Sequence, residues 1–142
     1  MVEAQTSKKI ALDPTAATAN STTTLTIDCA TFDYCTIDVQ LGHVSNASNV
    51  PTVIQLAESD VTNASTFVNI TGASHTSNVT ALPTTGCTIC TWDVSTIARK
   101  RFLQASVSPQ AAEVLAIVAN LSRAEQSPTT ATAKNVAAWI VL

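Results

Sequence analysis

The sequence predicts an all-β fold: a β-sandwich or jelly-roll-like single domain over residues 24–142, preceded by an extended N-terminal arm over residues 1–23. Three observations indicate it. Apolar and polar residues alternate with a period of two in most segments after residue 24, as in strands that bury one face. About seven or eight such runs recur at intervals of roughly a dozen residues, which is typical of sandwiches and jelly rolls. No amphipathic pattern long enough for a helix of three turns is present.

The arm is expected because residues 1–23 are rich in Ala, Thr and Asn and have little apolar periodicity. Such a segment is disordered alone or lies along a neighbouring molecule. A β-hairpin is expected to follow it. One face of the first strand carries Leu25, Ile27 and Cys29, and one face of the second carries Cys35, Ile37, Val39 and Leu41.

Further strands are expected over residues 52–58, 66–70, 88–94 and 100–107, separated by loops rich in Ser, Asn, Gly and Pro. Residues 113–121 are apolar on both faces, with Leu115, Ile117, Ala119 and Leu121 on one side and Val114, Ala116 and Val118 on the other. The second face of such a strand is covered within the fold or meets another subunit; an Ala-rich helix is the alternative. A Ser-Pro-Gln turn between the last two strands predicts a second hairpin, and the chain ends in an apolar tail over residues 135–142.

Composition excludes several classes of function. Only 12% of the 142 residues are charged, the net charge is −3, and the seven Lys and Arg residues form no electrostatic footprint for nucleic acid. No apolar run reaches membrane-spanning length, and residues 1–10 lack the apolar core of a secretion signal. We therefore expect no nucleic-acid or membrane partner.

Three sets of segments resemble the capsid decoration (cement) proteins of tailed bacteriophages: Phe32–Gly42; Val50–Asp60 with Phe67–Gly72; and Arg99–Leu103 with Val118–Pro128. The resemblance covers most of the chain after the arm, in order, although the four cysteines depart from the family pattern. It implies a β-rich structural protein of the virion, made in the host cytoplasm, that binds the major capsid protein on the outer surface of the capsid. It further implies a homo-oligomer with no enzymatic activity and no cofactor.

The expected contact elements are the arm, the outward face of residues 114–118 and the apolar tail. Trp139 is the favoured anchor because a buried Trp often dominates an interface. The predicted interface residues are Trp139, Ile140, Leu142, Val114, Ala116 and Val118. The alternative function is an adhesin or carbohydrate-binding module of a phage tail or fibre, in which Trp92 and Trp139 would stack on sugars. Aromatic residues make up only 4% of the chain, which is low for a carbohydrate binder.

Four cysteines leave three alternatives open: unpaired thiols, disulfides, or a zinc site made by Cys29, Cys35, Cys87 and Cys90. Cys29 and Cys35 flank the first predicted hairpin on matching faces, so they could lie close enough to bond. Cys87 and Cys90 form a Cys-x-x-Cys pair, but in a continuous strand their side chains point to opposite faces. The unpaired state is favoured over the disulfide, and the disulfide over zinc.

No catalytic residue is predicted. His43 and His75 lie in expected loops, and no arrangement of Ser, His and Asp supports a nucleophile. Most of the acidic residues considered as a catalytic pair, which are Asp28, Asp33, Asp38, Glu58, Asp60 and Asp93, fall in turns or at outward strand positions. The basic run of Arg99, Lys100 and Arg101 is interpreted as a solvated strand edge, or as a contact for an acidic groove on the capsid shell.

Overall fold

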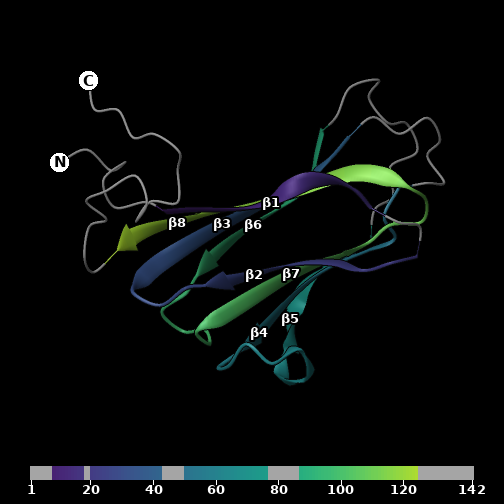
Figure 1. Ribbon diagram of the computed structural model, residues 1–142. Coiled ribbons are helices and arrows are strands. Elements are labelled where there is room, and N and C mark those ends of the chain that lie inside the picture. The colour runs from purple at the N-terminus through teal and green to yellow at the C-terminus, as the bar shows by residue number, and fades with distance from the viewer. Residues whose placement is uncertain (1–7, 18–19, 43–49, 77–86, 125–142) are drawn as a thin grey trace, which may run out of the picture.

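Two antiparallel four-stranded sheets pack face to face in the computed structural model, which describes residues 8–17, 20–42, 50–76 and 87–124 (Figure 1). The first sheet has the order β1 (Lys8–Ala17), β8 (Glu113–Ala124), β3 (Phe32–Leu41) and β6 (Cys87–Ser95). The second has the order β2 (Thr23–Asp28), β7 (Phe102–Ser108), β4 (Val53–Ser59) and β5 (Val68–His75). The predicted all-β sandwich is confirmed.

The core lies between the sheets and follows from the period of two in the sequence. In β7, buried and half-buried residues alternate without interruption from Phe102 to Ser108. Side chains of successive strand residues point to opposite faces, so one face of each strand reaches the interior. The fully buried side chains include Ile27, Ile37, Ile54, Leu103 and Ile117, which come from both sheets.

The predicted arm differs from the structure, because β1 lies within residues 1–23 and pairs with β8 from Lys8↔Leu121 to Ala17↔Glu113. The register shifts between Leu12 and Thr15, so Asp13 and Pro14 have no partner across the pair. Proline cannot donate a backbone hydrogen bond and is tolerated at such a bulge. The bulge interrupts the alternation of apolar and polar residues in β1, and the strand contains several polar residues. The sequence pattern therefore did not predict a strand here.

Both predicted hairpins are wrong in the same way. β2 and β3 belong to different sheets, as do β7 and β8, so each short connection is a corner that crosses from one sheet to the other. Alternation reveals a strand, but the partner of that strand depends on contacts that are distant in sequence. Among the described strands, β4 and β5 are consecutive neighbours in one sheet.

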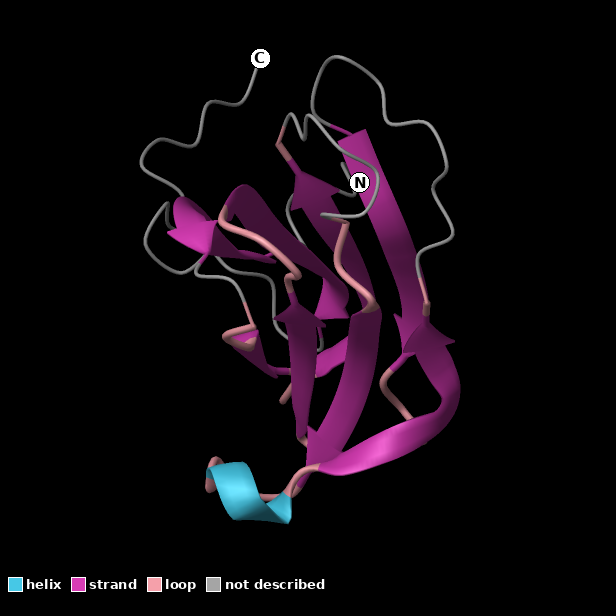
Figure 2. Ribbon diagram, turned by 90° about the vertical axis from the view of Figure 1, so that its right-hand side faces the viewer, coloured by secondary structure: helices cyan, strands magenta, loops and turns pink. Residues whose placement is uncertain are grey.

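The expected fourth strand ends at Ile70, yet β5 continues to His75. The β4–β5 register shifts between Gln55 and Ala57, and Gly72 lies in the unpaired stretch with a φ of +83°. Glycine adopts this conformation without a steric penalty, so the strand can kink and then resume pairing. A 3₁₀ helix over Ala64–Thr66, which the sequence pattern did not predict, connects β4 to β5 (Figure 2).

Candidate functional site

The outward face of β8 carries the apolar residues that were predicted to form an interface. We call Val114, Ala116 and Val118 the β8 row. They alternate with the buried Leu115 and Ile117, which places the row on the outer face of the first sheet. Val114 is 50% exposed, Val118 is half-buried, and Ala116 is buried. The row is thus a narrow apolar stripe whose end at Val114 is the most accessible part.

Polar side chains of β3, and of β6 beyond it, lie on one side of the β8 row in the same sheet. Gln40 and Asp38 of β3 pair with Ala116 and Val118 across the strands. The hydroxyl of Thr91 donates a hydrogen bond of 2.7 Å to Asp38, and the hydroxyl of Thr36 donates one of 2.8 Å to Asp93. These two carboxylates are therefore held by neighbours within the sheet. This part of the face therefore carries hydroxyl groups beside the apolar side chains of the β8 row.

The other predicted interface residues, Trp139, Ile140 and Leu142, lie outside the described residues, as does His43. His75 is exposed at the end of β5. Within the described ranges, no group of three or more His, Cys, Asp or Glu side chains is placed to hold a metal ion. No helix of the described part is long and apolar enough to span a bilayer.

The side chain of Cys87 lies outside the described part of the structure, and the three described cysteines do not converge on one point. Cys29 and Cys35 are buried in the core, whereas Cys90 is half-buried on β6. Cys90 pairs with Val39, and Cys35 pairs with Val94, so four residues of β3 separate the two thiols along the sheet, about 13 Å at about 3.3 Å per residue. One zinc ion needs its thiolates about 2.3 Å away. A single ion held by Cys29, Cys35 and Cys90 therefore does not fit this register.

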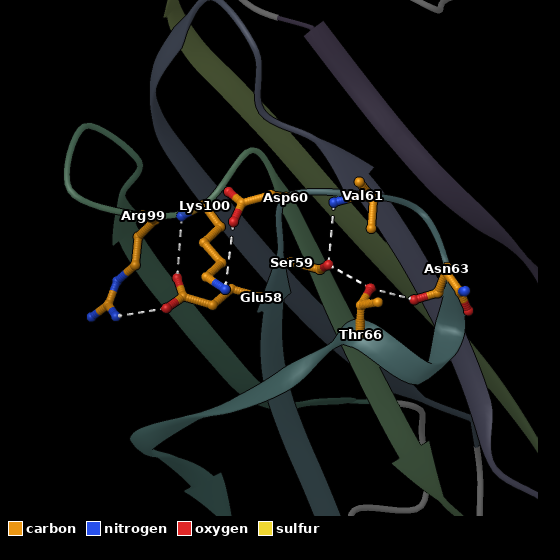
Figure 3. A network of polar contacts seen from close by, with 8 residues as sticks. All are labelled: Glu58, Ser59, Asp60, Val61, Asn63, Thr66, Arg99 and Lys100. Atoms are coloured by element: carbon orange, nitrogen blue, oxygen red, sulfur yellow. Dashed lines mark hydrogen bonds and ion pairs between the residues drawn. The ribbon is translucent and has the colours of Figure 1, made fainter.

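The basic run is paired with acids, which the sequence pattern did not predict. Arg99 and Lys100 lie 3.8 Å and 3.5 Å from Glu58 and Asp60, and the Lys100 amide also donates to Glu58 (Figure 3). Arg101 donates two hydrogen bonds, of 3.0 and 2.8 Å, to Asp28. These bonds lower the pKa of the Asp28 carboxyl below its usual range. The charges of the run are thus largely neutralised by β2 and by the end of β4, which weakens its interpretation as a contact for an acidic groove.

A second surface feature is a groove of about 410 Å³ between β5 and β6. Trp92 and Val94 of β6, with Ile70 and Ala73 of β5, form its apolar walls, and Arg99 adds a charged group. Trp92 is half-buried and packs against the core while it lines the groove. The side chain thus combines both roles that the sequence left open, core filling and an accessible aromatic surface.

Glu113, the first residue of β8, is an unusual feature of the core. It is only 6% exposed, and among the described residues both of its carboxylate oxygens are buried without a hydrogen-bond partner. Burial raises the pKa of this carboxyl to about 7. Sequence reasoning did not single it out, because a lone Glu at the start of a strand ordinarily points to solvent.

The chain matches no protein-family model and no curated protein. The segments on which the expected resemblance to decoration proteins rests correspond to β3, β4, the first half of β5, the start of β7 and the end of β8. They contribute to both sheets and to the strand that carries the β8 row.

Proposed function

We propose that this chain is a capsid decoration (cement) protein of a tailed bacteriophage, which binds the major capsid protein on the outside of the shell and stabilises the head. The observation that carries the proposal is the β8 row, an outward apolar stripe on a face whose neighbouring carboxylates are satisfied within the sheet. Such a face gains free energy by covering apolar surface, and it presents no side chain poised for chemistry. The segment resemblance supplies the identity of the partner.

The mechanism is binding alone. Many copies that assemble with one another and dock on the shell crosslink neighbouring capsid subunits and oppose the pressure of the packaged DNA. The contact elements are the β8 row together with Trp139, Ile140 and Leu142 of the apolar tail. A rigid sandwich suits this function because little conformational entropy is lost when a preorganised surface binds.

Replacing Val114 by aspartate is expected to weaken binding to capsids that lack the protein by at least about tenfold. The substitution removes about 1 kcal/mol of apolar burial and adds the cost of desolvating a charge at the contact. Co-sedimentation of purified protein with capsids measures the affinity. Val53→Asp is the matched control, because Val53 is 46% exposed on the other sheet. Equal losses in the two variants, or unchanged occupancy for Val114→Asp, would contradict the assignment of this face.

The second candidate function is a carbohydrate-binding module of a phage tail or fibre, and the groove at Trp92 is the observation that favours it. Aromatic rings beside polar groups are suited to stacking on sugars, and Trp92 shares the groove with Arg99 and Asp93. Copy number separates the two functions, since decoration needs many copies per particle and a tail part needs few.

A glycan screen provides the sharper comparison. If the groove binds sugar, replacing Trp92 by leucine is expected to abolish glycan binding and to leave capsid binding unchanged. The leucine keeps an apolar side chain against the core and removes the ring. A wild-type protein that binds no glycan and is abundant on virions would exclude this second function.

A further inference from the structure

One side of the sandwich, between the edge strands β5 and β6, is open in the described part of the structure. The groove of about 410 Å³ lies along this side. Two core residues, Leu56 and Ile70, line it together with Trp92 and Val94 of β6. On the opposite side of the sandwich, the edge strands β1 and β2 contact each other. The interior therefore reaches the surface along β5 and β6, where apolar side chains remain to be covered.

β6 is an edge strand that lacks most of the features that protect an edge. It pairs with β3 in a regular register over Cys90–Ser95, and none of the described strands pairs with its other side. This stretch contains no Lys, Arg or Pro, and its one charged residue, Asp93, accepts a hydrogen bond from Thr36 of β3. β1, the other edge of the same sheet, carries two lysines and a proline, which discourage further pairing. The free side of β6 is thus a template for an additional strand.

β8 ends at the same end of the first sheet as the groove. Ser122 of β8 and Ser95 of β6 both pair with Tyr34 of β3, and Ser95 also lines the groove. Arg123 adopts a φ of +56°, which departs from the extended conformation, and its guanidinium lies 5.2 Å from the centre of the Tyr34 ring. β8 is antiparallel to β3, and β3 is antiparallel to β6. A segment that turns back after β8 therefore runs antiparallel to β6.

Residues 135–142 have the composition and the reach that this side of the sandwich requires. They contain four β-branched or aromatic residues and no charged side chain. A strand beside β6 would lie three inter-strand spacings from β8, about 14 Å at about 4.8 Å each. Residues 125–134 can span up to about 33 Å, so they bridge this distance. Such a tether gives an effective concentration of about 1 mM, which favours the chain's own segment over that of a second copy.

We propose that residues 135–142 add a strand to the free side of β6, antiparallel to it, and cover the groove of the same chain. Backbone hydrogen bonds to β6 hold the segment, and apolar side chains from one of its faces cover Trp92 and Val94. Successive residues of a strand face opposite sides, so Trp139 lies on the face opposite to Ile140 and Leu142. The face that does not cover the groove extends the outer face of the first sheet, where the β8 row lies. A glycan and this segment cannot occupy the groove together.

Amide hydrogen exchange of the full chain, followed residue by residue by NMR, tests the pairing. In the wild-type protein we expect protection at the alternate amides of Cys90–Ser95 that point away from β3, because only a further strand can accept from them. Ala138→Pro removes a backbone donor within the segment and should lower this protection at least about tenfold. Ala133→Pro is the matched control, since it places the same residue before the segment, and it should keep the protection. Exchange of the β3 amides should be equal in all three proteins.

Three results would overturn the proposal. The first is rapid exchange of these alternate amides in the wild-type protein. The second is protection that survives Ala138→Pro, because another element would then cover β6. The third is protection that falls on dilution by about tenfold, because the segment would then come from a second copy. The inference goes beyond the proposed function and does not depend on it, since the contact lies within one chain and the test involves no capsid.

Discussion

Replacing Glu113 by glutamine is expected to stabilise the protein at pH 8 and to leave it nearly unchanged at pH 5. The carboxyl is buried without a described partner, and burial raises its pKa from 4.5 to about 7. The folded state therefore binds a proton that the unfolded state releases at lower pH. Stability is highest below the unfolded pKa, falls as the pH rises through the folded pKa, and reaches its lowest level above it. A neutral glutamine removes this dependence.

The shift corresponds to an upper limit of about 3–4 kcal/mol, at about 1.4 kcal/mol per pH unit. A buried amide without partners has a cost of its own, so we expect a net gain of about 1–2 kcal/mol at pH 8. Urea denaturation at both pH values measures it. Asp60→Asn, at an exposed acid paired with Lys100, is the control and should change stability by less than about 1 kcal/mol. Wild-type stability that is equal at the two pH values would contradict this account of Glu113.

Truncating Ile37 to alanine is expected to destabilise the protein by about 3–4 kcal/mol. Ile37 is fully buried in the middle of β3 and lies between Trp92 of β6 and Ala119 of β8. The substitution removes apolar surface and leaves a cavity that a packed sandwich cannot fill. Domains of this size have total stabilities of only about 5–15 kcal/mol, so the variant should be close to unfolding at physiological temperature.

Thermal and urea denaturation measure the effect, and Val68→Ala is the control. Val68 is 61% exposed on the edge strand β5, so its truncation should cost less than about 1 kcal/mol. Similar losses in the two variants would show that Ile37 is not at the centre of the core.

Most of the fold could be predicted from the sequence because burial leaves a periodic trace. β3 and β7 alternate cleanly, and both were predicted within a few residues. The sequence did not predict which strands pair with one another. Neither the two corners that were taken for hairpins nor the β1–β8 pairing has a signal in the local sequence. β1 was missed because Pro14 and the shift between Leu12 and Thr15 break the period.

The candidate site was predictable in part for the same reason. The β8 row follows from a run that is apolar on both faces, so its place on an outer face could be anticipated. The ion pairs of Arg99 and Arg101 depend on which strands lie side by side, and the isolation of Glu113 depends on what surrounds the first residue of β8. These features exist only in three dimensions. The burial of Cys29 and Cys35 was foreseen, because the alternation places both on the inward face.

The position of β8 between β1 and β3 has a consequence for biosynthesis. β1 cannot pair with β8 until β8 has been synthesised, because the two strands lie about a hundred residues apart in the chain. During translation the exposed flanks of β1 and β3 stay unpaired and are open to association with other nascent chains. The first sheet can therefore be completed only after β8 has been synthesised.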